Sequence, residues 1–580
     1  MYSIYARSAR ICYTPYMIRY IVFSLVALTL TLFTWLGGGI VAQWLRPWAL
    51  WLSLLMAEFA LLVPEQRHGE SLFDARKRVI RGILLDPLTW LSLALCTYLT
   101  IQWVNACTFM AWDELSESWK IFSPAFESLR NPAALAYMNT PPAIGDSGFL
   151  FWPEPPCAWL PWSLRADEAR GVLYWFVPTL VGVIVARHAL LNHTKRQLLA
   201  FVCIMTSVLA IAGILQFIAG SDFLYWGRKN AAFFFATFGY PNHAACFFPM
   251  VMALSIGMLL WTLEHRDVMK CLPARFYAAS TVLCAVSGIL SGSRAGMLLT
   301  LAVTAFSALY IPFRYFTSLP SKLRFAVPAL ILILGFTVVG TAGFRIYAIQ
   351  ANQAYAEAKA LAKTEEELAA VSRLPRYGQV PAVDGVLKEI ADTDWEMFIE
   401  HPMLMRSGYQ GILALRQHAD YPLFGSGAWS FRWLNIRYIN AEDPEEQKWF
   451  ENRKGVGQAN VHNDTLQYLA EHGWVGFGLM LAIIAALALP FLWVLVRSPA
   501  KTVSDVQADR CWLNRLNVAC VYIFIATFMA AFHSFIDLIF RSPACMMLYA
   551  LLFVCAPACV VGTKTTAYTP PSPKPEIPHA

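Results

Sequence analysis

The residues whose types and spacing suggest chemistry start with a histidine in the segment NVHNDTLQYLAEHGWVG, residues 460–476. His462 and Asn463 come just before an apolar, helix-periodic run, and Asp464 with Gln467 has the spacing of a helix N-cap pair. His462 is therefore predicted at the start of a helix, where the positive end of the helix dipole favours anions and the neutral imidazole that a general base requires. The alternative is a structural histidine that only bonds a loop carbonyl.

Arginines form a second group of candidates. Arg294 lies in the turn SGSRAG (291–296) between two apolar segments, where small neighbours would let a bulky ligand approach a guanidinium that binds phosphate as a fixed fork. Arg228 precedes another apolar segment, and Arg406 lies further along the chain. Each could instead be a solvated arginine or one that extends to lipid headgroups. With His462, they suggest an anion-binding site.

A third group, His533, Asp537 and Arg541, ends the next-to-last apolar segment. Ionisable residues at membrane depth are functional by default. Here the spacing favours a structural ion pair between Asp537 and Arg541.

The elements that must position these residues are membrane helices. Only 14% of the 580 residues are charged and 57% are hydrophobic, whereas ordinary domains have roughly 25% charged residues. Because a single soluble core stops growing at about 250–300 residues, the apolar surplus must face lipid. This excludes a soluble enzyme, a disordered chain and a fibrous repeat.

The chain is predicted to be an all-α polytopic membrane protein with about 12 transmembrane helices, each requiring ~20 apolar residues. The predicted spans are 20–36, 46–63, 85–106, 170–188, 197–218, 242–263, 276–291, 295–313, 325–343, 473–496, 515–534 and 543–561.

The distribution of Lys and Arg among the loops places both termini in the cytoplasm by the positive-inside rule. Two long segments are then external: 107–169, rich in Pro and aromatic residues, and 344–472, a small domain that includes a water-exposed helix at Ala354–Val371. The predicted organisation is N-terminal helices (1–106), the first external segment (107–169), core helices (170–343), the large loop domain (344–472), C-terminal helices (473–561) and a disordered Pro-rich tail (562–580).

Most of the 13 cysteines lie in or beside apolar spans, where they act as small hydrophobes. Cys107 and Cys157 are both predicted to be external and could form a disulfide, with two free thiols as the alternative. No zinc-type Cys/His spacing, nucleotide-binding loop or carboxylate triplet for Mg²⁺ stands out. We therefore predict no cofactor, no metal and no nucleic-acid partner.

Several of these segments resemble the O-antigen ligase family of membrane glycosyltransferases, which includes O-antigen polymerases and bacterial protein O-oligosaccharyltransferases. The resemblance covers roughly residues 200–560. It is carried by HNDTLQYLAEHGWVG (462–476), SGSRAG (291–296), TFGYPNHAACF (237–247), YPLFGSGAWSF (421–431) and HSFIDLIFRSPA (533–544).

The resemblance implies a GT-C-like fold in the bacterial inner membrane, with a large periplasmic loop between spans 9 and 10. It implies that His462 and Arg294 are catalytic, that Arg228, Arg294 and Arg406 hold the donor pyrophosphate, and that five residues support them. The supporting residues are Asp464, Asn463, Gly425, Gly427 and Asn242. The segment 107–169 and the Ala-rich helix of the large loop have no counterpart in the resemblance.

The expected reaction is an inverting, metal-independent transfer of a glycan from an undecaprenyl-diphosphate carrier to an acceptor hydroxyl of lipid A-core or a similar molecule. A polymerase that extends a glycan and an oligosaccharyltransferase that modifies a protein remain alternatives, because the acceptor is not encoded in these motifs. A transporter of lipid-linked sugars is the alternative from another class. It would be expected to show paired halves and midplane charges.

Overall fold

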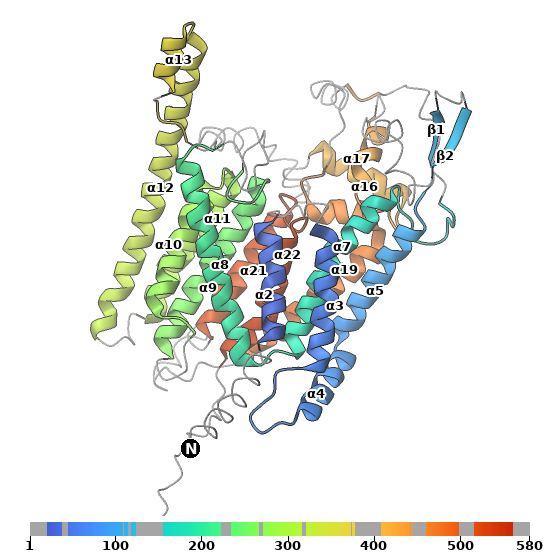
Figure 1. The fold of residues 1–580 in the computed structure, drawn as a ribbon, viewed down its shortest axis with the longest axis horizontal. Helices are drawn as coiled ribbons and strands as arrows, with labels where there is room; N and C mark the ends of the chain where they lie inside the picture. Colours follow the sequence, from blue (N-terminus) through green and yellow to red (C-terminus); the bar gives the residue numbers. More distant parts are fainter. Residues whose placement is uncertain are drawn as a thin grey trace, which may run out of the picture.

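The computed structural model describes the chain in thirteen segments and contains mainly helices (Figure 1). The described residues are 20–36, 45–107, 109–113, 118–122, 155–221, 234–265, 271–315, 321–372, 374–377, 408–440, 442–444, 460–497 and 516–560. The predicted tail at 562–580 lies outside them.

The elements follow one another as helices with a single two-stranded hairpin among the described segments. In chain order they are α2 (Ile21–Trp35), α3 (Arg46–Leu62), α4 (Leu72–Leu85), α5 (Pro87–Val104), β1 (Phe109–Asp113), β2 (Ser118–Phe122), α7 (Ala166–His188), α8 (Asn192–Ile218), α9 (Pro241–Glu264), α10 (Ala274–Leu290), α11 (Arg294–Tyr315), α12 (Ser321–Leu361), α13 (Glu365–Val371), α16 (Tyr409–Asp420), α17 (Phe431–Leu434), α19 (Asp464–Arg497), α21 (Val518–Ser534) and α22 (Pro543–Cys555), with 3₁₀ turns at Asn435–Tyr438 and Ala556–Cys559.

Each apolar segment predicted to span the membrane coincides with a helix. Within the described residues, six helices are long and apolar enough to cross a bilayer: α7, α8, α9, α11, α12 and α19. The pair α4 and α5, bent by 62° at Asp86, would make a seventh if it acts as one span. The chain is thus a helical, multi-pass membrane protein, and the further spans remain predictions carried by shorter apolar helices.

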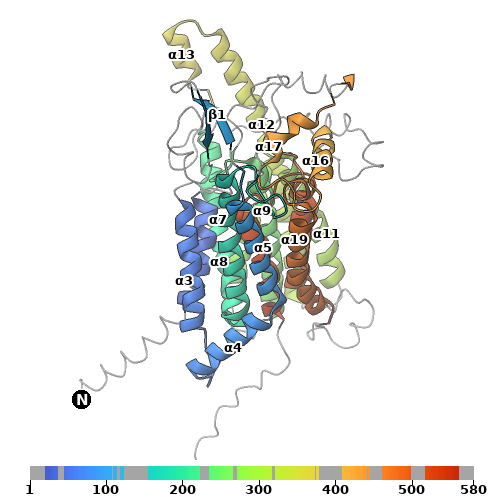
Figure 2. The same cartoon turned by 90° about the vertical axis from the view of Figure 1, so that its right-hand side faces the viewer.

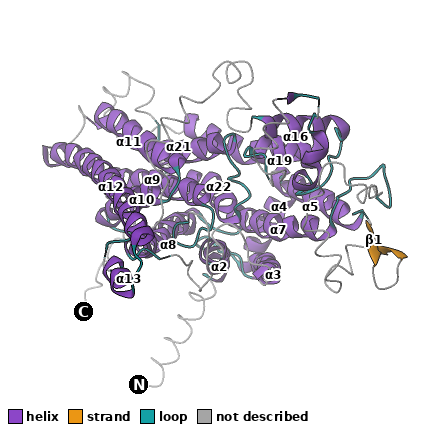
Figure 3. Ribbon diagram, turned by 90° about the horizontal axis from the view of Figure 1, so that it is seen from above, coloured by secondary structure: helices purple, strands orange, loops and turns teal. Residues whose placement is uncertain are grey.

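The helices run side by side and separate two ends of the molecule (Figures 1 and 2). The basic helix α4 lies at one end. The hairpin, α13, α16 and α17 lie at the other, which we call the α16 end. Seen from above, α9 and α22 lie within the array, and α8, α10, α11 and α21 surround α9 (Figure 3).

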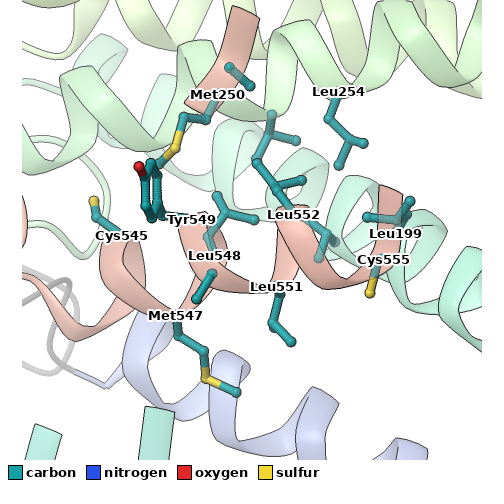
Figure 4. Packing of buried hydrophobic residues seen from close by; sticks show 14 of the residues in the cluster. Leu199, Met250, Leu254, Cys545, Met547, Leu548, Tyr549, Leu551, Leu552 and Cys555 are labelled. Atoms are coloured by element: carbon teal, nitrogen blue, oxygen red, sulfur yellow. The ribbon is translucent and has the colours of Figure 1, made fainter. Parts of the chain in front are cut away.

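The core is built around α9, whose most apolar 18-residue stretch is entirely buried. Small residues let its neighbours approach closely, as they do at membrane helix interfaces: a Cβ at Gly257 would lie 2.8 Å from the Cβ of Tyr522 in α21. Helix α22 extends this core. In Figure 4, its Leu552 lies among side chains of other helices that include Leu254 of α9 and Leu199 of α8.

The first part of the predicted large loop, 344–472, continues the preceding membrane helix. Helix α12 continues without interruption from its apolar part to Leu361, so the exposed helix predicted at Ala354–Val371 is not a separate element. The break falls at residues 362–364, because Thr364 and Glu367 form a reciprocal capping box that starts α13. The other segment predicted to be external, 107–169, contains the β1–β2 hairpin, which the sequence did not predict.

The structure holds Cys107 and Cys157 as free thiols, so the disulfide alternative is wrong. Hydrogen bonds of the Asn105 side chain, rather than a disulfide, hold this segment. The amide of Asn105 donates to the Cys157 carbonyl (2.8 Å) and the Pro161 carbonyl (3.1 Å), and it accepts from the Cys157 N–H (2.9 Å). The backbone N–H of Cys107 also donates to the Ser163 carbonyl (2.9 Å).

These thiols should differ in reactivity. Burial raises the pKa of Cys107 to about 12, and only the thiolate is nucleophilic. We therefore expect iodoacetamide near neutral pH to label the partly exposed Cys157 well before Cys107 in folded protein, and to label both after unfolding without reductant. Peptide mass spectrometry measures this, with Cys157→Ser as the control. Labelling of the pair only after reduction would contradict the free-thiol assignment.

Candidate functional site

Four distant segments meet through polar side chains, and three of them are helix N-termini. Tyr240 and Asn242 lie at the start of α9, Ser293 immediately precedes α11, and His462 lies two residues before the first residue of α19. The fourth segment is the connection between α21 and α22, which carries Asp537. An N-terminus is where a helix leaves backbone N–H groups unpaired, so polar chemistry can gather there.

Asp537 is the centre of this arrangement. Its side chain is fully buried, and Oδ1 lies 3.1 Å from Nδ1 of His462. The hydroxyl of Tyr240 donates to the same carboxylate at 2.8 and 2.9 Å. The Asn242 amide also donates to it, and so does the backbone N–H of Leu538 at 2.8 Å. Donors from three parts of the chain therefore surround the carboxylate.

His462 is positioned by its backbone as well as by Asp537. Its φ is +56°, in the left-handed region, where histidine is among the better tolerated residues. The side chain is 29% exposed, and its Nδ1 faces the buried carboxylate. The Tyr240 hydroxyl lies 3.4 Å from the same nitrogen. With the Nδ1–H tautomer, Nδ1 donates to Asp537 and Nε2 is the proton-accepting nitrogen.

The cap of α19 lies one residue earlier than predicted. The side chain of Asn463 accepts from the Leu466 N–H (3.0 Å), so Asn463 rather than Asp464 is the N-cap. Asp464 instead accepts from the Phe540 N–H at 2.7 Å, which joins α19 to the connection that carries Asp537. The predicted position of His462, beside the start of this helix, is confirmed.

The turn SGSRAG is joined to the same network. The Ser293 hydroxyl donates to the Asn242 side chain, whose amide in turn bonds Asp537. Arg294 is the first residue of α11 and is partly buried. The structure thus joins Asn242 to His462 through Asp537, and it places the turn that carries Arg294 beside them.

The predicted ion pair between Asp537 and Arg541 is wrong. Arg541 pairs with Glu471 of α19, at 2.6 Å, and both side chains are buried. Its guanidinium also lies over the ring of Trp429, 4.2 Å from the centroid. A spacing of four residues suggested the local pair, but the segment is not helical there, and residues about 70 positions earlier supply the partners of both charges.

Gly425 and Gly427 have packing roles. Both have positive φ (+65° and +92°), and a Cβ on Gly425 would lie 2.3 Å from the backbone of Glu471. A Cβ on Gly427 would lie 2.3 Å from the Cα of Ser163. These glycines let the 421–431 segment pass against α19 and the 163 region. They support the site by holding its surroundings in place.

Two predicted arginines, Arg228 and Arg406, lie outside the described residues. Sequence reasoning missed Tyr240, which stands inside the motif at 237–247, and it assigned Asp537 to a pair with Arg541 rather than to His462. The signal available was that each motif contains a polar residue beside an apolar run. Nothing local indicated that the two would meet.

The arrangement contains the groups required for acid–base chemistry beside a bound anion. His462 has a carboxylate on one ring nitrogen, which orients the ring and stabilises the imidazolium formed when the other nitrogen takes a proton. The N-termini of α9, α11 and α19 contribute partial positive charge, and Arg294 adds a full one. Within the described residues, no group of three or more His, Cys, Asp or Glu is placed to hold a metal ion.

No protein-family model matches the chain, and no curated protein matches it.

The contact at Gly425 yields a test of stability. Gly425→Ala should destabilise the protein by about 2–4 kcal/mol, because a β-carbon both clashes with α19 and disfavours the positive φ. Gly478→Ala is the matched control on α19, where nothing lies within 4 Å of an added Cβ. It should be neutral or slightly stabilising. Thermal unfolding of the purified proteins in detergent measures both, and equal midpoints would contradict the packing role.

Proposed function

We propose that this protein is an inverting glycosyltransferase of the O-antigen ligase type. It transfers a glycan from an undecaprenyl-diphosphate carrier to an acceptor hydroxyl at the periplasmic face of the bacterial inner membrane. The observation that carries the proposal is the bonded group His462–Asp537–Tyr240, joined through Asn242 and Ser293 to the turn that carries Arg294.

His462 acts as the general base in this proposal. Nδ1 is held by Asp537, so Nε2 accepts the proton of the acceptor hydroxyl as its oxygen attacks the anomeric carbon. The new bond is C–O to the acceptor, and the bond that breaks joins the anomeric carbon to the diphosphate oxygen. The diphosphate leaves with the electron pair. Attack from the side opposite to the leaving group inverts the anomeric configuration.

Positive charge assists the departure of the diphosphate. Arg294, at the N-terminus of α11, would bind its oxygens and stabilise the charge that develops on them in the transition state. The helix N-termini beside it act in the same direction. Arg228 and Arg406 remain proposed further contacts to the same pyrophosphate.

The acceptor distinguishes the members of this reaction class. Lipid A-core, a growing glycan and a protein Ser or Thr all present a hydroxyl to the same base, and the same donor serves all three. A transfer assay that offers each acceptor with one defined lipid-linked donor separates ligase, polymerase and protein oligosaccharyltransferase. We propose the lipid A-core type as the first acceptor to test.

Loss of the base should abolish most transfer. We expect His462→Ala to lower kcat by about 10²–10⁴-fold, the usual contribution of a positioned general base. Asp537→Asn should also lower kcat, with a smaller effect on KM, because it removes the charge that orients the imidazole and stabilises its protonated form. Initial rates with purified protein measure both effects.

The control for these variants is His68→Ala, which removes an exposed histidine near α4 and should retain the wild-type rate. Full transfer by His462→Ala would remove the general-base role. Transport of the donor without any transfer to an acceptor would support the transporter alternative instead.

The proposed chemistry uses arginines and helix dipoles for the charge of the leaving group. We therefore expect full activity in excess chelator, measured after dialysis of protein and donor. Loss of activity in chelator that added Mg²⁺ restores would show that a metal takes part. The same assay with Arg294→Ala should show a large loss, and Arg81→Ala, an exposed arginine of α4, should not.

A further inference from the structure

A second arginine, which the sequence did not single out, lies behind the turn of Arg294. Arg345 is in α12 and is 1% exposed, among the largest fully buried side chains described. Helix α12 has 41 residues and is therefore about 60 Å long, twice the hydrocarbon thickness of a bilayer. Arg345 contacts residues at the α10–α11 turn, so it lies at the level of the candidate site.

The contacts of Arg345 are with both ends of that turn. Its Nη1 donates to the carbonyl of Ile289 (2.9 Å), at the end of α10, and lies 3.4 Å from the carbonyl of Ser293. The Ile289 carbonyl belongs to the last turn of its helix, where carbonyls have no intrahelical partner. One guanidinium thus bridges two backbone carbonyls that lie on either side of Ser291–Gly292.

Close packing holds the turn as well. A Cβ on Gly296 would lie 2.5 Å from the Gly288 carbonyl and 2.6 Å from the Ser291 hydroxyl, so α10 and α11 are in direct backbone contact here. The backbone that carries Arg294 is therefore fixed by glycine contacts between α10 and α11 and by the guanidinium of Arg345 from α12. Such fixation is what a preorganised anion site requires.

We propose that Arg345 is a positioning residue of the diphosphate subsite: its guanidinium fixes the turn that presents Arg294. This rests on the proposed function, since it assigns the donor's diphosphate to the α10–α11 turn. Arg345 acts through Arg294 and the turn, and it does not itself touch the ligand.

The test compares full-length Arg345→Met and Arg345→Lys with wild type. The probes are undecaprenyl diphosphate and inorganic pyrophosphate, and binding is measured by calorimetry in detergent. We expect Arg345→Met to weaken binding of both probes by tenfold or more. Arg345→Lys, which keeps the charge and a carbonyl donor, should recover most of the affinity. Lys359→Met, an exposed lysine of the same helix, is the matched control and should bind like wild type.

A double-mutant cycle separates positioning from simple loss of stability. If Arg345 acts through Arg294, Arg345→Met should have little further effect on affinity in an Arg294→Ala protein, whereas independent sites add. If Arg345→Met does not fold, the binding affinity of Arg345→Lys provides the test. That affinity should be a few-fold lower than the affinity of wild type. Fully additive effects on affinity would overturn the proposal.

The outcomes also distinguish a failure of the role proposed for Arg345 from a failure of the proposed function. Wild-type affinity in both Arg345 variants, in a protein that transfers glycan, overturns the role of Arg345 alone. A second outcome is that wild-type protein binds pyrophosphate and Arg345→Met binds it more weakly, but the wild type transfers no glycan to any acceptor. This would overturn the proposed function and keep the assignment of an anion subsite at this turn.

Discussion

The buried carboxylate of Asp537 is the interaction on which the candidate site depends. A carboxylate removed from water is costly unless donors surround it, and removal of one partner leaves an uncompensated buried group. Its donors come from the start of α9 and from His462 before α19, positions that are 297 and 75 residues away in the chain. The need to satisfy this one charge therefore holds three separate parts of the bundle in a single geometry, and that geometry orients the imidazole.

The membrane explains why so much polar chemistry gathers at helix ends. Within lipid, every backbone group must be paired inside the helix, so unpaired N–H groups and polar side chains are tolerated mainly where helices begin and end. Here α9, α11 and α19 all begin at the same region, and their N-termini point partial positive charge toward it. Arg294 adds its positive charge to this region, and Arg345 bonds the backbone of the turn that carries Arg294. The apolar lengths of the same helices pack on one another or face the lipid.

Local sequence patterns were sufficient for the elements but not for their partners. The apolar segments coincide with helices because length and hydrophobicity along the chain decide whether a segment can enter a bilayer. The position of His462 beside the start of α19 followed from similar local reasoning. The Asp537–Arg541 pair and the N-cap at Asp464 were inferred from short spacings, and both were wrong because the actual partners of these residues were not the ones that their own spacing suggested.

The sequence by itself determined that this chain lies in a membrane, which segments are helical, and which motifs contain polar residues beside apolar runs. Only the tertiary structure decided that Tyr240 and His462 share Asp537, that Arg541 pairs with Glu471, and that Arg345 holds the turn before Arg294. The physical reason is range. Hydrophobicity and helix capping act over a few neighbouring residues, whereas the pairing of buried charges is settled by how whole helices pack, between positions that no local pattern connects.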